Sequence, residues 1–297
     1  MFCITWGGEL ENPYAFGAGR SDPSGLFLAA EKGWEGVRTI TIVIVTLNNW
    51  PVLKRFLDSI WTHKHHQRLS VIVVDNGSND NTWDMLMQWA MSGLSSYFIR
   101  NTENLGYGAG ANIGIKRAQE VNTDADILLC NDDMELLPGC IDNLAETFDR
   151  NKDAGMVGGK LLYPNGVIQH AGAFLNEAYI GYHYGQGKRP EDFPETPQEQ
   201  VMKDFQFVTG AMVLIRGEVL KIVGGFDPAF GMGYYEDADM CWRVRDAGWQ
   251  VIYNPNAKAI HHEGTTTRKW GASRGEILRK SRNAFIAKHA VPDWGDE

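Results

Sequence analysis

The sequence ITIVIVTLNNWP, residues 40–51, sets the fold class of this chain. Its first eight residues are apolar or β-branched without alternation, which is typical of a strand buried on both faces of a sheet. Asparagines then break the run, and Pro51 suits the first turn of a helix because its ring fixes a helical φ. Apolar residues recur at helical spacing from 52 to 61. We therefore predict a strand over 40–47 followed directly by a helix.

The same alternation of buried strand and helix continues as far as residue 130. Further strands are expected over 70–74, 97–100 and 126–130, and helices over 82–91 and 106–120. Strands separated by helices form parallel sheets with right-handed crossovers. We therefore predict an α/β fold with a Rossmann-like, mostly parallel central sheet flanked by helices. Ligands of such sheets bind beyond the carboxyl ends of the strands, so polar residues there are the first candidates for a site.

The second half of the chain is predicted to be a smaller, mixed region. Short strands are expected over 155–162, 167–173, 205–216, 250–253 and 257–261, and helices over 218–223, 235–247 and 275–289. A Pro-Asn-Gly turn joins the first two of these strands, and the last helix is basic. Residues 1–36 are rich in glycine and proline, and we interpret them as an extension of unknown role.

Composition excludes several classes of protein. With 297 residues, 43% of them hydrophobic, the chain can bury a large core. Its net charge of −9 argues against a non-specific nucleic-acid binder, which needs a basic face. Its four cysteines contain no Cys-x-x-Cys pair, which favours a reducing, cytoplasmic location. We expect no secretory signal and no transmembrane segment, while peripheral contact with a membrane is compatible with the sequence.

Acidic residues follow two of the predicted strands. Asp75 closes one strand and can accept hydrogen bonds from a base or a ribose, and the alternative is a helix N-cap. Asn131-Asp132-Asp133 follows a buried strand, and its adjacent carboxylates repel each other unless they are solvated or share a cation. Carboxylates of this kind suit Mg²⁺ or Mn²⁺ bound together with substrate phosphates. The alternative for this second group is a solvated turn.

A later acidic cluster, Glu236-Asp237-x-Asp239, begins a predicted helix. The helix dipole favours acidic residues there, which is the structural explanation. A carboxylate beside a hydrophobic wall can also act as a general base. His261 and His262 end a short strand, where a histidine can bind a metal or a phosphate, although a surface pair is commoner.

The glycine-rich stretch GYGAGANIG, residues 106–114, does not form a dinucleotide fingerprint. Its glycines fall on alternate residues and follow the third predicted strand, whereas G-x-G-x-x-G follows the first strand of its unit. We therefore exclude nicotinamide binding. A glycine-rich helix start still allows a nucleotide to approach the backbone closely.

Taken together and in this order, these segments resemble glycosyltransferase family 2, an inverting family with the GT-A fold, and especially its rhamnosyltransferase-like members. The resemblance extends over residues 39–268, and eight segments in this order are hard to produce by chance. They are TIVIVTLN (41–48), VVDNGSNDNT (73–82), NTENLGYGAGANIG (101–114), LLCNDDME (128–135), TGAMVLIR (209–216), GGFD (224–227), YEDADMCWR (235–243) and HHEG (261–264).

The resemblance implies a role for each matching position. Asp133 and His261 would bind a divalent cation, Mn²⁺ or Mg²⁺, that bridges the donor diphosphate. Asp237 would be the catalytic base, and Glu236 would orient the acceptor. The residues implied in donor binding are Thr46, Asn48, Asp75, Asn104, Gly110, Asn112 and Asp132. The residues implied on the acceptor side are Trp242, Arg243 and Asp239.

The resemblance also implies the reaction: transfer of a sugar, such as rhamnose, from a UDP- or dTDP-sugar to a hydroxyl of a glycan, a lipid-linked saccharide or a protein. The implied parts are an N-terminal extension (1–36), a GT-A domain (37–270) with a nucleotide-sugar half (37–135) and an acceptor half (150–270), and a C-terminal helix (271–297). Two alternatives stay open. One is a catalytically inactive nucleotide-sugar-binding module. The other is a nucleotidyltransferase, which would need an early basic phosphate loop that residues 46–51 lack.

Overall fold

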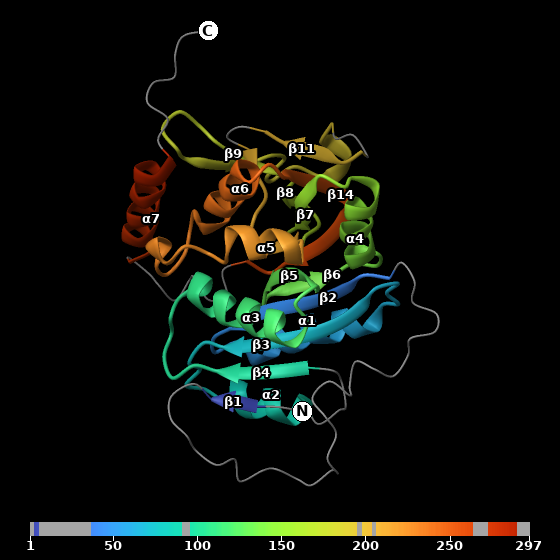
Figure 1. Cartoon of the computed structure of the whole chain (residues 1–297), viewed down its shortest axis with the longest axis vertical. Helices are drawn as coiled ribbons and strands as arrows, with labels where there is room; N and C mark the ends of the chain where they lie inside the picture. Colours follow the sequence, from blue (N-terminus) through green and yellow to red (C-terminus); the bar gives the residue numbers. More distant parts are fainter. Residues whose placement is uncertain are drawn as a thin grey trace.

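The computed structural model describes the residues 3–5, 37–90, 96–194, 198–203, 206–263 and 273–289. Within these ranges the predicted fold class is confirmed: a mostly parallel central sheet is flanked by helices (Figure 1). Most of the predicted extension over 1–36 lies outside the described residues, as do the predicted ends of a helix at Met91 and of a strand at Phe205.

Five neighbouring strands form the parallel part of the central sheet, in which β2 lies between β3 and β5. In spatial order they are β1 (Cys3–Thr5), β4 (Ser96–Arg100), β3 (Arg68–Asp75), β2 (Thr39–Thr46) and β5 (Asp126–Asn131). The pairing of β2 with β3 places Thr46 beside Asp75, and its pairing with β5 places Val45 beside Asn131. The carboxyl ends of these strands therefore meet at one edge of the sheet, as the sequence predicts.

The sheet continues into the second half of the chain, where it becomes mixed. Its further strands are β6 (Met134–Leu136), β7 (Ala154–Leu162), β8 (Ile168–His170), β11 (Gln200–Met202), β13 (Met212–Ile215) and β14 (Gln250–His261). Strand β13 runs antiparallel between β5 and β7, while β14 runs parallel to β7. Strand β14 also pairs antiparallel with β6, which sets His261 opposite Met134. The end of the second half is thereby joined to the acidic turn that follows β5.

A separate three-stranded sheet consists of β9 (Ala173–Leu175), β10 (Gly181–His183) and β12 (Gln206–Phe207). It accounts for two errors in the predicted strands. The predicted strand over 167–173 breaks because Gly172 adopts a φ of +85°, so that β8 and β9 join different sheets. The predicted strand over 205–216 is likewise divided between β12 and β13.

A third correction joins two predicted strands, 250–253 and 257–261, into the single strand β14. The register of β14 against β7 shifts between Asn254 and Lys258. Pro255 lies within this shift, where its missing N–H removes no regular ladder hydrogen bond.

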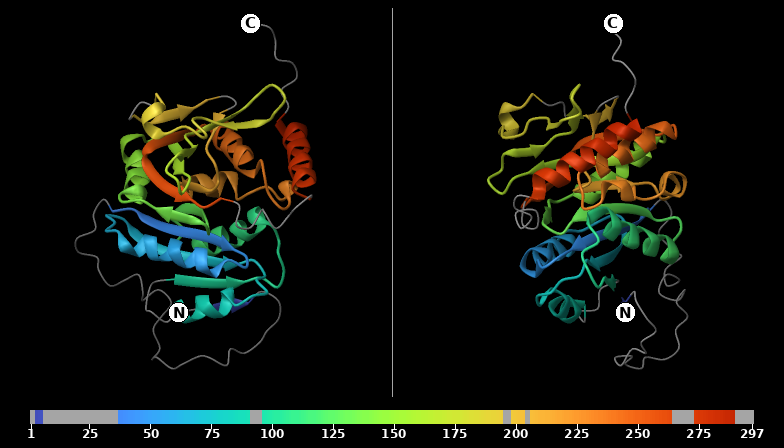
Figure 2. Two further views of the ribbon diagram at one scale, coloured as in Figure 1. Left: turned by 180° about the vertical axis from the view of Figure 1, so that it is seen from behind. Right: turned by 90° about the vertical axis from the view of Figure 1, so that its left-hand side faces the viewer.

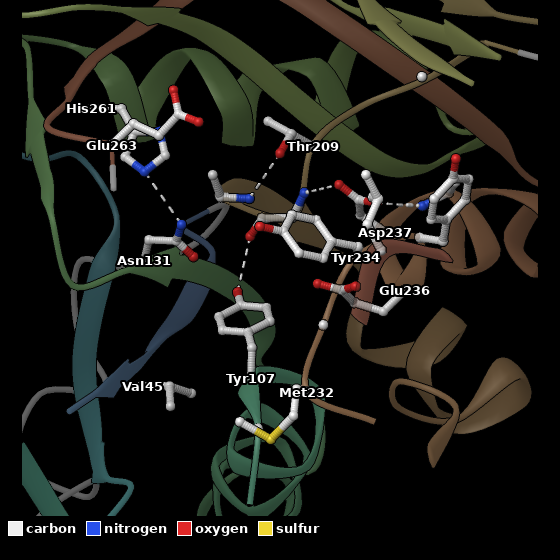
Figure 3. A pocket seen from close by; sticks show the side chains of 18 of the residues that line it. Val45, Tyr107, Asn131, Thr209, Met232, Tyr234, Glu236, Asp237, His261 and Glu263 are labelled. Atoms are coloured by element: carbon white, nitrogen blue, oxygen red, sulfur yellow. Dashed lines mark hydrogen bonds between the residues drawn. The ribbon is translucent and has the colours of Figure 1, made fainter. Parts of the chain in front are cut away.

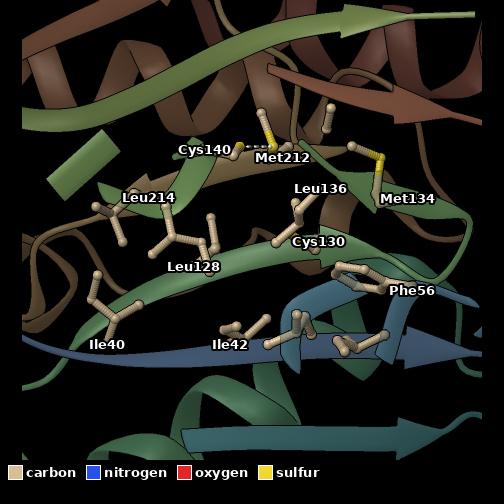
Figure 4. Packing of buried hydrophobic residues seen from close by; sticks show 14 of the residues in the cluster. Ile40, Ile42, Phe56, Leu128, Cys130, Met134, Leu136, Cys140, Met212 and Leu214 are labelled. Carbon is tan, nitrogen blue, oxygen red and sulfur yellow. Dashed lines mark hydrogen bonds between the residues drawn. The ribbon is translucent and has the colours of Figure 1, made fainter. Parts of the chain in front are cut away.

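Helices cover both faces of the central sheet (Figure 2). They are α1 (Trp50–Thr62), α2 (Thr82–Ala90), α3 (Tyr107–Val121), α4 (Cys140–Arg150), α5 (Gly217–Val223), α6 (Glu236–Asp246) and α7 (Ser273–His289), with short 3₁₀ turns at Pro190–Asp192 and Pro228–Phe230. Alternate residues of β2 enter two different hydrophobic cores. Ile40 and Ile42 pack with Phe56 of α1 (Figure 4), and Ile44 belongs to the same core. Val43 instead faces α3. No helix among the described residues has the length and apolar character that a membrane span requires.

Glycines let α3 lie directly on the sheet. A Cβ atom on Gly114 would stand 2.3 Å from Cγ1 of Val43, and one on Gly110 would stand 2.9 Å from Cγ1 of Val45. No side chain fits in so small a gap, so the glycines set the distance between helix and sheet. This close approach also fixes the position of Tyr107 at the start of the helix.

We expect Gly114→Ala to lower the free energy of unfolding by roughly 1–3 kcal/mol, because the new methyl group overpacks the contact with Val43. Gly275→Ala in α7 is the matched control, since nothing lies within 4 Å of its added Cβ. This control should raise stability by up to ~1 kcal/mol, through helix propensity alone. Urea denaturation of both variants measures the difference. A Gly114→Ala protein as stable as the control would refute the close contact.

Candidate active site

A cavity of about 550 Å³ opens beyond the carboxyl ends of β2 and β5. The first turns of α3 and α6, the end of β14 and the small sheet complete its wall. Figure 3 shows that His261 and Asn131 lie on one side of this cavity, with Glu236 and Asp237 on the other. Seven predicted site residues line it: Thr46, Asn104, Asp132, Asp133, Glu236, Asp237 and His261.

The acidic turn after β5 is buried and in contact with the end of β2. Thr46 Oγ1 donates a hydrogen bond of 2.6 Å to Asp132 Oδ2. Burial and the neighbouring charge of Asp133 raise the pKa of Asp132 to about 7. Two adjacent carboxylates with little access to water therefore hold a proton near neutral pH, unless a cation offsets their charge.

His261 lies beside this turn, and a chain of side chains fixes its orientation. Gln169 donates from Nε2 to Glu263 Oε2 at 2.9 Å, which orients the amide so that its oxygen faces His261. His261 Nδ1 lies 2.7 Å from that oxygen and must be the donor. The other ring nitrogen, Nε2, then lies 2.9 Å from Asp133 Oδ1. Asn131 Nδ2, a donor, also faces Nε2 at 3.3 Å, which supports the same tautomer.

This geometry suits a bound cation. In the neutral tautomer, the lone pair of His261 Nε2 and the carboxylate of Asp133 point at each other, and a proton or a metal ion between them relieves the repulsion. A histidine that binds metal commonly donates its second N–H to a side chain such as Gln169. No group of three or more His, Cys, Asp or Glu that could hold a metal ion occurs in the described ranges. Remaining ligands would have to come from substrate oxygens or water, as is common for Mg²⁺.

Glu236 and Asp237 begin α6 on the opposite wall of the cavity. Asp237 accepts hydrogen bonds from the N–H groups of Gly210 at 3.2 Å and Ala238 at 2.8 Å. Burial raises the pKa of Asp237, and burial together with the charge of Asp237 raises the pKa of Glu236 to about 8. The Oε2 atom of Glu236 is buried and has no hydrogen-bond partner within the described part of the chain. The two carboxyl groups thus differ, since N–H groups of two other residues donate to Asp237, whereas the Oε2 atom of Glu236 has no donor among the described residues.

The backbone before these residues is strained. Tyr234 and Tyr235 both adopt positive φ, of 71° and 66°, which is uncommon for residues other than glycine. The hydroxyl of Tyr235 donates to Tyr179 O at 2.6 Å, and Tyr107 donates to Gly210 O at 3.0 Å. These contacts hold the start of α6 against both the small sheet and α3. Strain of this kind persists where the surrounding structure imposes it, and it is frequent at functional sites.

His183 completes the wall and is paired with buried His170, a pair that the sequence analysis does not predict. His170 and His183 face each other with their Nδ1 atoms 2.8 Å apart. The N–H of Thr209 points at His170 Nε2 at 3.4 Å, so His170 donates from Nδ1 and His183 accepts. Burial lowers the pKa of both imidazoles, and His183 lines the cavity close enough to Asp237 for their charges to interact. These histidines come from β8 and β10, and no local sequence pattern shows that these two strands lie close together.

Seven other predicted site residues do not line this cavity: Asn48, Asp75, Gly110, Asn112, Trp242, Arg243 and Asp239. Asn48 accepts hydrogen bonds from the N–H groups of Asn79 and Asp80, and Asp75 accepts from that of Ser78. These contacts order the loop between β3 and α2. The roles of Asn48 and Asp75 in donor binding stay predictions.

The other predicted residues outside the cavity also make structural contacts. Asn112 binds both backbone groups of Phe226, while Arg243 binds the carbonyls of Val223 and Gly225. Although burial opposes it, hydrogen bonds from His289 and Lys288 and the charge of Arg243 lower the pKa of Asp239 to about 2. The rings of Trp242 and Phe285 pack edge to face, 5.2 Å apart. Their predicted roles at the donor and acceptor likewise stay predictions.

Comparisons with known proteins agree with this architecture. The family described as glycosyltransferase-like family 2 matches residues 38–283. An N-acetylglucosaminyl-diphospho-decaprenol L-rhamnosyltransferase from Mycobacterium tuberculosis is 28% identical over 270 residues, which cover 86% of each chain. A mannosyltransferase from Pyrobaculum calidifontis, solved with GDP-Man and Mn²⁺, has a TM-score of 0.59 at 19% identity over 85% of this chain and 65% of its own. GalNAc-T7, solved with UDP, GalNAc and Mn²⁺, has a TM-score of 0.62 at 14% identity over 88% of this chain and 53% of its own.

The chain therefore belongs to glycosyltransferase-like family 2, and its fold is the GT-A fold. The predicted family is confirmed over more than half of the sequence. The two solved structures are longer than the part that this chain matches, and at these identities they establish the fold alone.

We expect Glu236→Gln to stabilise the ligand-free protein increasingly as pH rises from about 5 to 8. In the native state Glu236 keeps its proton up to a pKa of about 8, whereas its ordinary value is 4.5. Between these values the unfolded chain binds fewer protons, so the glutamate loses native stability as pH rises, and glutamine does not. The melting temperature should gain about 2–4 °C for each 1 kcal/mol. Glu218→Gln, at an exposed position, serves as the control. If Glu236→Gln raised the melting temperature by the same amount at all pH values, the prediction would be contradicted.

Proposed function

We propose that this member of glycosyltransferase-like family 2 transfers a sugar from a UDP- or dTDP-sugar to a hydroxyl acceptor, with inversion at the anomeric carbon. The observation that carries the proposal is that Asp133 and Asp237, 104 positions apart in the sequence, line one cavity. Asp133 lies 2.9 Å from His261, which Figure 3 shows across the cavity from Asp237. One carboxylate is placed to help hold the leaving diphosphate, and the other to receive a proton. An inverting displacement needs both functions and no covalent nucleophile.

Donor binding is proposed for the side of the cavity formed by the ends of β2 and β5. Thr46, Asn104 and Asp132 line that side and offer hydroxyl, amide and carboxyl groups to a nucleotide. A diphosphate would be repelled by the acidic turn alone, so we propose that Asp133 and His261 bind it through Mn²⁺ or Mg²⁺. When bound, such a cation offsets the charge that grows on the leaving diphosphate. The orientation of His261 by Gln169 supports this arrangement.

Proton transfer is proposed for the wall formed by α6. Asp237, which accepts two backbone hydrogen bonds, is the better base because these donors stabilise its charged form. Glu236 keeps its proton near neutral pH and can donate a hydrogen bond to the acceptor. As the acceptor oxygen bonds to the anomeric carbon, its proton passes to Asp237 and the bond to the diphosphate oxygen breaks. Neighbouring carboxyl groups with divided protonation states are a recurrent basis for acid and base roles.

Rhamnose and a lipid-linked acceptor are proposed as the substrates. The support is the likeness to the Mycobacterium tuberculosis rhamnosyltransferase, whose name specifies a sugar diphosphate on decaprenol as acceptor. Incubation of the protein with Mn²⁺ and a panel of UDP- and dTDP-sugars tests the donor. Slow hydrolysis of one donor, with dTDP-rhamnose foremost, is the expected result. Tight binding without turnover, even with acceptors present, would instead favour the binding module.

We expect Asp237→Asn to lower the transfer rate by about 10²–10⁴-fold, the usual contribution of a general base. Donor affinity should change little, because Asp237 lies across the cavity from the proposed donor side. Single-turnover rates and calorimetric donor binding with Mn²⁺ separate the two effects. An equal loss of rate and of donor affinity would argue against a role as base.

We expect Asp133→Ala to abolish the part of donor binding that depends on the metal. Titration of UDP in the presence and absence of Mn²⁺ measures this part without any turnover. Asp142→Ala is a suitable control, since this buried acid caps the loop at His66 instead of lining the cavity. If Mn²⁺ strengthens UDP binding to Asp133→Ala as much as to the wild type, Asp133 is not a ligand.

A further inference from the structure

Exposed apolar side chains gather at the mouth of the cavity. Ile180, Tyr182 and Leu278 are 45%, 47% and 42% exposed. They are three of the six large exposed hydrophobic residues in the described ranges, the others being Leu105, Val201 and Ile222. Ile180 and Leu278 also line the cavity, so these two exposed side chains lie at its opening, and Tyr182 follows two residues after Ile180 in β10. Apolar groups that cluster at an opening indicate a contact with something other than water.

The two segments that carry these residues lie side by side. The turn between β9 and β10 contacts α7, because Arg282 donates to Ala178 O. The ring of Tyr179 lies 6.1 Å from that of Phe285, a fully buried residue of α7. Figure 1 shows α7 next to the strands of the small sheet. The turn and the helix therefore form one continuous surface around the mouth.

The charge of this surface is opposite to that of the whole chain. Helix α7 carries five basic residues and one acid, whereas the chain has a net charge of −9. Lys288, in the last turn of the helix, forms ion pairs with Asp227 and Asp239. Arg274, one helical turn before Leu278, lines the cavity with it, and Arg279 is exposed next to Leu278, whereas Lys280 lies on the opposite face of the helix. Acidic residues nearby are Glu276, which pairs with Lys280 at 2.8 Å, and exposed Glu177 on the turn.

We propose that the mouth surface, defined by Ile180, Tyr182, Leu278, Arg274 and Arg279, docks on an anionic phospholipid bilayer. Apolar and aromatic side chains enter the interface between headgroups and acyl chains, while lysine and arginine bind the anionic headgroups. Basic side chains beside the apolar ones distinguish this surface from a plain apolar contact, since they match the charge of such a bilayer.

Docking in this orientation would set the opening of the cavity against the membrane. An acceptor headgroup could then reach Asp237 while its lipid stays in the bilayer. This consequence rests on the proposed function, because it takes the acceptor to be lipid-linked. The docking itself does not depend on which sugar is transferred.

Co-sedimentation with vesicles tests the docking without any substrate. We expect the full chain to bind vesicles of phosphatidylcholine mixed with phosphatidylglycerol, and to bind pure phosphatidylcholine vesicles at least tenfold more weakly. Because each basic residue near such a surface contributes about 1 kcal/mol, the double variant Arg274→Glu/Arg279→Glu should weaken binding to the mixed vesicles by at least tenfold. High salt should weaken the wild type in the same direction.

The chain offers a matched control for this charge reversal. Lys54 and Arg55 on α1 are likewise two exposed basic residues of one helix, and neither lines the cavity. The double variant Lys54→Glu/Arg55→Glu changes the net charge equally and should bind the mixed vesicles nearly as well as the wild type. Equal losses in both double variants would show that overall charge, not the mouth surface, controls binding.

The apolar part of the surface has its own test. Ile180→Ser/Leu278→Ser should weaken binding to the mixed vesicles, whereas Ile222→Ser on α5, which removes a more exposed side chain, should not. Unchanged melting temperatures confirm that the variants fold. If the wild-type protein binds neither kind of vesicle, the proposal is overturned and a protein partner becomes the better explanation of the surface. Hydrolysis of a sugar nucleotide in the absence of vesicles is measured separately, so a failure of docking and a failure of the proposed function give different results.

Discussion

The antiparallel pairing of β14 with β6 is the constraint on which the site depends. It sets His261 opposite Met134, one residue after Asp133, and the N–H of His262 donates to Asp133 O at 2.9 Å. Without this pairing the acidic turn would end the first half of the chain as a solvated loop. With it, a residue 128 positions later in the sequence lies 2.9 Å from the Asp133 carboxylate. Strand order thus creates the candidate cation site.

Among the described residues that line the cavity, acidic side chains outnumber basic ones, of which Arg274 is one. Asp132, Asp133, Glu236, Asp237 and Glu263 all line it. The pKa values of Asp132, Glu236 and Asp237 are raised, because burial disfavours the charged form of each carboxyl group. Any ligand that brings positive charge to the turn relieves part of this penalty, so ligand binding and stability are coupled. A ligand of this kind therefore binds most strongly under the conditions in which the ligand-free site destabilises the protein most.

Residue patterns predicted the parts of the site that come from strand ends. The run from Ile40 and the acids after β5 suffice to place Thr46, Asp132 and Asp133 at one sheet edge, since parallel strands end together. The Gln169–Glu263 and His170–His183 pairs were not predictable, because they depend on how the second half folds over the first. The small sheet was missed for a related reason: the positive φ of Gly172 divides a run that reads as one strand.

The distribution of charge bears on the order in which ligands bind. Basic residues lie at the mouth, on α7, while the acids lie within the cavity. A sugar nucleotide would therefore be attracted to the opening and then repelled by Asp132 and Asp133 unless a cation accompanies it. Glu236 and Asp237 lie on the side of the cavity opposite His261, and the uncharged hydroxyl of an acceptor meets no such barrier there. The charges alone therefore favour entry of the cation before or with the diphosphate, and they leave the acceptor to bind independently of that step.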